Sequence, residues 1–161
     1  MTTQDCDIAS FTDSAMFDRT FDEGMALVEE TARYLDGKGR EEARILSRKA
    51  AMLYAGESMR VTTRLMQAAS WLLVQRAVRD GDMERADAQH DRYRLGSREI
   101  CLGTCAEDIA PLPAQLQDLL GRSDSLYRRI ARLDDVLFGE SEAPLGARGQ
   151  MDALAQAFGP R

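Results

Sequence analysis

The longest stretch of sequence without a helix breaker runs from Arg40 to Asp80, where there is no proline and one glycine, Gly56. About 39 residues at 1.5 Å each make a helix of roughly 58 Å, which is longer than a compact domain of this size is wide. We therefore expect this helix either to bend, with Gly56 as the candidate site, or to extend beyond its own bundle.

Two apolar stripes run along this long helix. The main stripe has heptad spacing, as in helices that pack along their length, and it consists of Ile45, Met52, Met59, Met66 and Leu73. The second stripe follows the C-terminal half and consists of Val61, Leu65, Ala68 and Leu72. Because the helix is apolar nearly all round between Leu65 and Val74, it needs a second neighbour, either from the same chain or from another copy.

The main stripe is interpreted as core filling. Since methionine is unbranched and polarisable, a surface that repacks against several partners is the alternative. The surplus stripe predicts a homodimer, because exposing it would leave a larger apolar patch than soluble monomers usually tolerate. The residues predicted to mediate self-association are Leu65, Ala68, Trp71 and Leu72. For Trp71, a core position and an interface position are equally favoured.

Two more helices are predicted on either side of this one. The first begins after the capping side chains of 12–14, ends at the glycines of 36–39, and buries the stripe Phe17, Phe21, Met25, Val28, Ala32 and Leu35. The last runs from about Pro113 to Gly139 along Leu116, Leu119, Leu120, Ser123, Leu126, Tyr127, Ile130, Leu133 and Leu137. We expect an all-α, antiparallel, up-down-up three-helix bundle.

Between the second and last helices, Met83–Tyr93 is predicted to be a short exposed helix or a continuation past a kink. Gly96–Pro111 is predicted to be a loop. The helical domain is assigned to 12–139, with a flexible leader at 1–11 and a disordered tail at 140–161. In the tail, Met151, Leu154 and Phe158 have the i, i+3, i+7 spacing of a short helix that folds on a partner, with chance as the alternative.

Composition limits the class of protein. A length of 161 residues fits one domain, and 44% hydrophobic residues are enough for a core. The net charge of −6 argues against a general binder of nucleic acid or membrane surfaces. No apolar stretch is long enough to cross a membrane. Three cysteines without disulfide spacing and an acidic, polar start predict a cytoplasmic protein without a secretory signal.

The sequence predicts no catalytic, metal or cofactor site. It has no phosphate loop and no dinucleotide fingerprint. His90 is the one histidine; Asp87 before it supplies half of a di-iron motif, but a solvated helix residue is the favoured interpretation. Cys101 and Cys105 are interpreted as free thiols in a loop. A redox-sensitive pair, or a zinc site completed by Cys6 or His90, is the alternative.

Arginines recur at helical spacing. Arg40, Arg44 and Arg48 lie four residues apart, Arg60 and Arg64 repeat the step, and a further cluster consists of Arg128, Arg129 and Arg132. A solvated face balanced by nearby glutamates is the main interpretation. A docking surface for an acidic partner is the second, and DNA binding is the third.

Three blocks of the sequence are distinctive: FDRTFDEGMALVEETARYLDGKGR at 17–40, SMRVTTRLMQAASWLLVQRAV at 58–78 and SLYRRIARLD at 125–134. These blocks resemble the RcdA family of bacterial regulators of CtrA degradation, within a resemblance that spans about 11–138. The resemblance implies three-helix bundles that form homodimers, carry a flexible C-terminal tail and have no catalytic residues.

The resemblance also implies a non-enzymatic adaptor that tethers cell-cycle regulator cargo to the ClpXP protease. Such adaptors work with a response-regulator-like protein and a cyclic-di-GMP-binding co-adaptor, and a concentration at a cell pole is expected. The predicted partner-binding residues are Arg40, Arg44, Arg48, Met151, Leu154 and Phe158. The alternative function is a DNA-associated transcriptional regulator built on a helical bundle.

Overall fold

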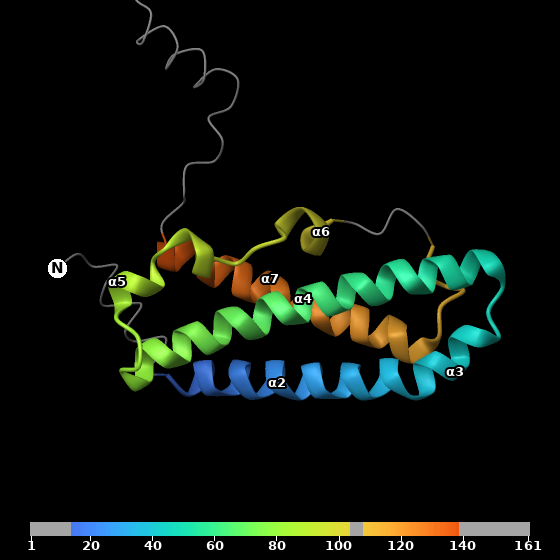
Figure 1. Ribbon diagram of the computed structural model, residues 1–161, viewed down its shortest axis with the longest axis horizontal. Coiled ribbons are helices and arrows are strands. Elements are labelled where there is room, and N and C mark those ends of the chain that lie inside the picture. Colours follow the sequence, from blue (N-terminus) through green and yellow to red (C-terminus); the bar gives the residue numbers. More distant parts are fainter. Residues whose placement is uncertain (1–13, 104–107, 139–161) are drawn as a thin grey trace, which may run out of the picture.

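The computed structural model describes residues 14–103 and 108–138, and all regular structure among them is helical. Three long helices form the bundle: α2 (Ala15–Asp36), α4 (Arg48–Asp80) and α7 (Ala114–Phe138) (Figure 1). The shorter elements are α3 (Lys38–Arg44), α5 (Arg85–Ala88), the 3-10 helix η1 (Asp91–Tyr93) and α6 (Arg98–Leu102). The predicted all-α bundle is confirmed. The leader at 1–11 and the tail at 140–161 lie outside the described residues.

Helix α2 begins where the capping residues predict. The Phe17 N–H donates to the Ser14 hydroxyl at 3.3 Å, which satisfies one of the free donors of the first turn. The buried face is shifted from the predicted stripe: Phe17 is buried and Ala32 is exposed, while the other four residues of the stripe are partly buried and pack against the edge of the core. The residues that face the core are Phe17, Thr20, Gly24, Leu27, Thr31 and Tyr34. Small and polar side chains in this row bring α2 close to α4; a Cβ on Gly24 would lie 2.9 Å from Leu72 Cδ1.

The long helix is interrupted near its start and not at Gly56. Helix α3 ends at Arg44, and α4 begins at Arg48 after Ser47, whose hydroxyl accepts a 3.2 Å hydrogen bond from the Ala50 N–H. From there α4 continues for 33 residues through Gly56. It ends at Gly81, which has a φ of 81° and so occupies the left-handed region that favours glycine.

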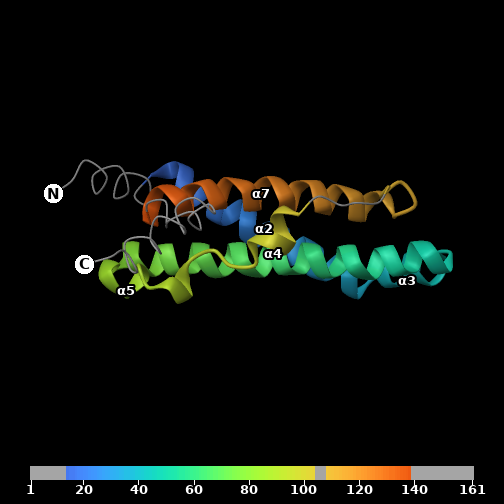
Figure 2. The same ribbon diagram turned by 90° about the horizontal axis from the view of Figure 1, so that it is seen from above.

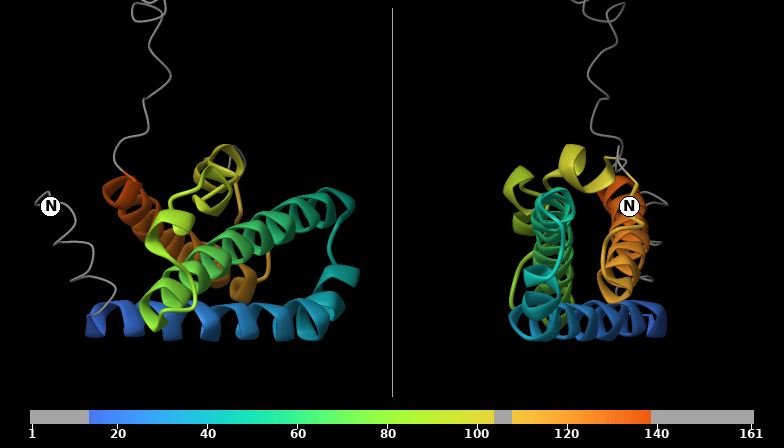
Figure 3. Two further views of the ribbon diagram at one scale, coloured as in Figure 1. Left: turned by 60° about the vertical axis from the view of Figure 1, so that its left-hand side comes forward. Right: turned by 90° about the vertical axis from the view of Figure 1, so that its right-hand side faces the viewer.

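The direction of α7 differs from the predicted up-down-up order. Arg64 of α4 pairs with Asp124 at 3.0 Å, and Trp71, farther along α4, hydrogen bonds to Asp134, farther along α7. The two helices therefore run in parallel, as Figure 2 shows, while α2 is antiparallel to both. Figure 3 shows α2 lying along one side of the α4–α7 pair. Parallel neighbours need a long connection, and residues 81–113 provide it.

The described parts of this connection pack against the bundle at several points, which the loop predicted for Gly96–Pro111 did not anticipate, whereas the short and mostly exposed helix predicted within Met83–Tyr93 is present. Leu95, Cys101 and Leu112 are buried in the same hydrophobic cluster as the long helices. Between Met83 and Tyr93 the chain forms α5 and η1, and Ala88 of α5 is also buried. Helix α6 forms within the predicted loop.

Candidate protein-binding site

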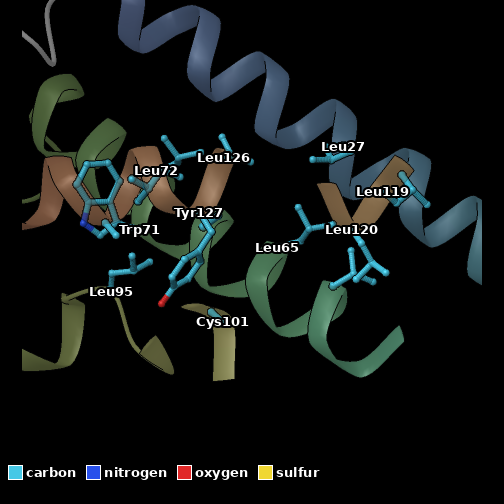
Figure 4. Close-up of a cluster of buried hydrophobic side chains, with 14 of the residues drawn as sticks. Leu27, Leu65, Trp71, Leu72, Leu95, Cys101, Leu119, Leu120, Leu126 and Tyr127 are labelled. Carbon is cyan, nitrogen blue, oxygen red and sulfur yellow. The ribbon is translucent and has the colours of Figure 1, made fainter. Parts of the chain in front are cut away.

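The second apolar stripe of α4 lies in the core of its own chain. Val61, Leu65, Ala68 and Leu72 are each no more than 3% exposed. Figure 4 shows Leu65, Trp71 and Leu72 among side chains of α2 and α7, including Leu27, Leu126 and Tyr127. The prediction that Leu65, Ala68, Trp71 and Leu72 mediate self-association is wrong, because α2 and α7 supply both neighbours that these side chains need. For Trp71, the structure selects the core alternative.

The main stripe of α4, interpreted from the sequence as core, is exposed. The exposed fractions are 86% for Ile45, 71% for Met52, 73% for Met59, 65% for Met66 and 52% for Leu73. Ile45 lies in the break after α3, so α4 itself carries the last four, which we call the exposed row: Met52, Met59, Met66 and Leu73. Both faces of α4 are apolar, and only one of them is covered within the described chain.

A groove of about 270 Å³ lies between the C-terminal half of the exposed row and α2. We call it the α2/α4 groove. The side chains that line it are Val28, Thr31, Ala32, Leu35, Thr62, Leu65, Met66, Ala69, Ser70 and Leu73. None of these described residues is charged. The groove is therefore an apolar surface that suits an apolar side chain of another segment and offers no group for acid–base chemistry.

One polar group in this groove lacks a partner. Thr31 is 3% exposed, and its buried hydroxyl has no hydrogen-bond partner among the described residues. A buried hydroxyl without a partner costs free energy that a partner would recover.

Two buried polar residues hold the connection 81–113 against the bundle. Asp134 is fully buried and accepts hydrogen bonds from Trp71 Nε1 at 2.9 Å, Leu95 N at 3.2 Å and Arg98 at 2.8 Å. Arg64 is 5% exposed and donates to the Cys101 carbonyl at 2.8 Å. These contacts keep the connection on the side of α4 where α7 lies.

Arg64 is therefore a structural residue and not part of a basic docking stripe. It pairs with Asp124 at 3.0 Å and donates to the Leu120 carbonyl at 3.3 Å. Its burial lowers the pKa of the guanidinium, an effect that the Asp124 carboxylate opposes. One sequence signal distinguishes Arg64 from the exposed arginines: it lies on the same helical face as Val61 and Leu65.

Comparisons with known proteins agree on one family. A family model described as a protein of unknown function (DUF1465) matches residues 8–158. No curated protein matches the chain. The crystal structure of RcdA from Caulobacter crescentus CB15 is 51% identical, with a TM-score of 0.67, and the match covers 83% of this chain and 99% of that chain. The chain belongs to the RcdA family. The resemblance carried by the three sequence blocks is confirmed.

The predicted basic residues of this RcdA-family chain are exposed but do not form one helical stripe. Arg40 and Arg44 lie on α3, whereas Arg48 begins α4 beyond the break, so the spacing of four does not place all three on one face. Arg40 forms a salt bridge with Asp36 at 3.2 Å. On α7, Arg128 pairs with Asp124 at 2.7 Å and Arg129 with Glu23 at 2.6 Å. These pairs agree with the interpretation of a balanced solvated face.

The remaining candidates in this RcdA-family chain provide no chemical centre within residues 14–103 and 108–138. No group of three or more metal-ligating side chains occurs among them. Cys101 is fully buried on α6, and this burial raises the pKa of its thiol. Cys6 and Cys105 lie outside the described residues, and His90 is exposed. None of the described helices combines the length and apolar character that spanning a bilayer requires.

Proposed function

We propose that this chain is a non-enzymatic adaptor of regulated proteolysis, which tethers cell-cycle regulator cargo to the ClpXP protease. The observation that carries the proposal is the exposed row of α4, whose last two side chains, Met66 and Leu73, also line the apolar α2/α4 groove. Methionine-rich surfaces repack against different partners, as an adaptor with several cargo proteins requires. The 51% identity to RcdA, a regulator of CtrA degradation, supports this role.

We also propose that two copies associate through the exposed row. Met52, Met59 and Met66 are seven residues apart, with the smaller Ala55, Thr62 and Ala69 between them. This spacing resembles the seam along which two helices pack side by side. A self-complementary contact between two copies of α4 would satisfy the two-fold symmetry that most homodimers have.

In this proposal the other partners are those of the family. A response-regulator-like protein and a cyclic-di-GMP-binding co-adaptor join the chain at the protease, in the cytoplasm and concentrated at a cell pole. Arg40, Arg44 and Arg48 are proposed to contact acidic surfaces of these partners, and the tail residues Met151, Leu154 and Phe158 are proposed to hold cargo. A tether that carries a weak binding motif raises the local concentration of the cargo that it holds.

The adaptor role can be tested by reconstituted degradation. Purified ClpXP, the two co-adaptors and a cell-cycle regulator are mixed with the full chain, and loss of the regulator is followed over time. We expect the full chain to accelerate degradation and Met59→Glu to reduce that acceleration, because a charge in the middle of the exposed row must be desolvated on docking. Glu99→Gln, at an exposed position of α6, is the control that should leave the rate unchanged.

Two results would contradict the proposal. In one, the full chain does not alter degradation of any cell-cycle regulator tested. In the other, Met59→Glu accelerates degradation as well as the unmodified chain does while its fold is intact by circular dichroism.

A further inference from the structure

The residues that line the α2/α4 groove repeat at the spacing of a short helix on both of its sides. On α4, Met66, Ala69 and Leu73 line it at i, i+3 and i+7, and on α2, Val28, Ala32 and Leu35 line it at i, i+4 and i+7. Seven residues of helix rise about 10.5 Å. A docked helix with apolar side chains at the same spacing would place one anchor near each end of the groove and one near its middle.

The chain contains one such segment beyond the bundle. Met151, Leu154 and Phe158 have the i, i+3, i+7 spacing, and alanines fill positions 153, 155 and 157 between them. We propose that residues 151–158 dock in the α2/α4 groove of their own chain. The proposed function assigns cargo binding to these same residues, and the present inference concerns where they lie when no cargo is bound. It is tested by contacts within the isolated protein.

The connection is long enough for this contact. Helix α7 ends at Phe138, which lies with Gln75 and Val78 of α4 around one small cavity. The groove ends at Leu73, two residues before Gln75 along α4. Residues 139–150 can span up to about 40 Å when extended, whereas passing around one helix with its side chains requires roughly 15–20 Å.

The same geometry gives the segment a direction. Because the connection reaches the groove at its Leu73 end, Met151 lies nearest Leu73 and Phe158 lies nearest Thr62. The segment then runs antiparallel to α4. Leu35 of α2, which lines the groove, completes the site for Phe158.

Attachment to the same chain favours this occupant over a separate molecule. A short flexible connection gives an effective concentration of about 1 mM, so even a contact with a dissociation constant near 1 mM is half occupied. A docked segment also covers Met66 and Leu73, the C-terminal end of the exposed row. Cargo that takes residues 151–158 would therefore uncover this end of the row.

The test is intramolecular photo-crosslinking in the full chain. Phe158→p-benzoylphenylalanine places a photoreactive group at the last anchor, and equal amounts of 14N- and 15N-labelled chains separate crosslinks within one chain from crosslinks between chains. We expect crosslinks within one chain, from position 158 to residues near Leu35 and Thr62. Crosslinks only between chains, only to other parts of the surface, or only to the leader would each overturn the proposal.

A matched pair of variants separates this inference from dimerisation and from the adaptor role. Met66→Glu lies in the groove and should reduce the crosslink about fivefold, because a contact weakened tenfold, by about 1.4 kcal/mol, falls from half occupancy to about one tenth. Met52→Glu has the same chemistry and lies on the same row outside the groove lining, so it should leave the crosslink unchanged. An equal effect of both substitutions on the crosslink would overturn the docking proposal. An equal effect on the crosslink is compatible with normal cargo delivery, so the docking proposal can fail while the adaptor proposal stands.

Discussion

The indole Nε1 of Trp71 donates a 2.9 Å hydrogen bond to the fully buried carboxylate of Asp134. This contact links the C-terminal half of α4 to the last turns of α7. The same carboxylate accepts from the Leu95 backbone and from Arg98, so it joins α4, α7 and the connection 81–113 at one point. A buried carboxylate with several donors is costly to remove because the donors remain buried without a partner.

The first prediction concerns this carboxylate. Asp134→Ala should reduce the free energy of unfolding by about 3–5 kcal/mol, the usual cost of breaking a buried charged pair by removing one partner. Asp135→Ala is the matched control, since the side chain of Asp135 is 47% exposed and also pairs with Arg98, at 2.9 Å. It should cost less than about 1 kcal/mol. Urea unfolding followed by circular dichroism measures both, and equal losses would contradict the role given to Asp134.

The second prediction separates the two apolar faces of α4. Leu65→Ala removes a core side chain and should reduce the free energy of unfolding by about 2–5 kcal/mol. Met59→Ala removes an exposed side chain and should change that free energy by less than about 0.5 kcal/mol.

In sedimentation experiments Met59→Glu should shift the protein from dimer to monomer. A dilute unmodified chain that sediments only as an 18 kDa species would contradict the proposed dimer.

The third prediction concerns alkaline pH. Burial raises the pKa of the Cys101 thiol, so the folded chain keeps this proton to a higher pH than the unfolded chain, where thiols titrate near about 8.5. This contribution to stability is complete below the unfolded pKa and is lost as the pH rises through the folded pKa. The free energy of unfolding should fall above about pH 8.5, and Cys101→Ala should remove that part of the fall.

Cys101→Ala should not abolish the alkaline loss entirely, because two buried tyrosines also contribute to it. Burial also raises the pKa of Tyr34 and of Tyr127, and these phenols titrate near about 10 in an unfolded chain. The measurement is urea unfolding at a series of pH values under reducing conditions. Identical pH dependence in the unmodified chain and in Cys101→Ala, between about pH 8.5 and 10, would contradict the assignment to Cys101.

The fourth prediction concerns metal. The described residues contain no group of three or more metal-ligating side chains, so a chelator should leave the thermal midpoint unchanged. A structural zinc would contribute folding free energy outright and its removal would lower the midpoint. Differential scanning calorimetry with and without chelator measures this. A stoichiometric metal in the purified protein would instead implicate Cys101, Cys105 and His90.

The fifth prediction concerns the tail. Deleting 140–161 should leave the helical content and the dimer intact and should change the thermal midpoint little, since side chains of α2, α4 and α7 already form a large hydrophobic cluster among the described residues. The deletion should impair delivery of at least one cargo. Leu154→Ala combined with Phe158→Ala should reproduce much of that loss in the degradation assay. An unfolded truncated chain would mean that 151–158 belongs to the core.

Local signals are enough to predict the three long helices. Ser14 and Gly81 mark helix ends because capping and a left-handed turn depend on adjacent residues. The apolar period of α7 also identified its buried face. The sequence does not predict the break before α4, although Ser47 is a good N-cap. Helix-compatible residues lie on both sides of Ser47, so the segment resembles one continuous helix in which Gly56 is the expected site of a bend.

The buried face of α4 was decided by tertiary packing. The row that includes Met59 and the stripe that includes Leu65 are both apolar at helical spacing, so periodicity alone does not distinguish them. Gly24 and Thr31 on α2 let that helix approach one face closely, and α7 covers the rest of it. The direction of α7 and the burial of Asp134 likewise depend on residues far apart in the chain. The sequence determined which segments are helical because helix formation and capping are local. The structure determined which apolar side chains are free to bind a partner, because burial depends on which neighbours the fold brings together.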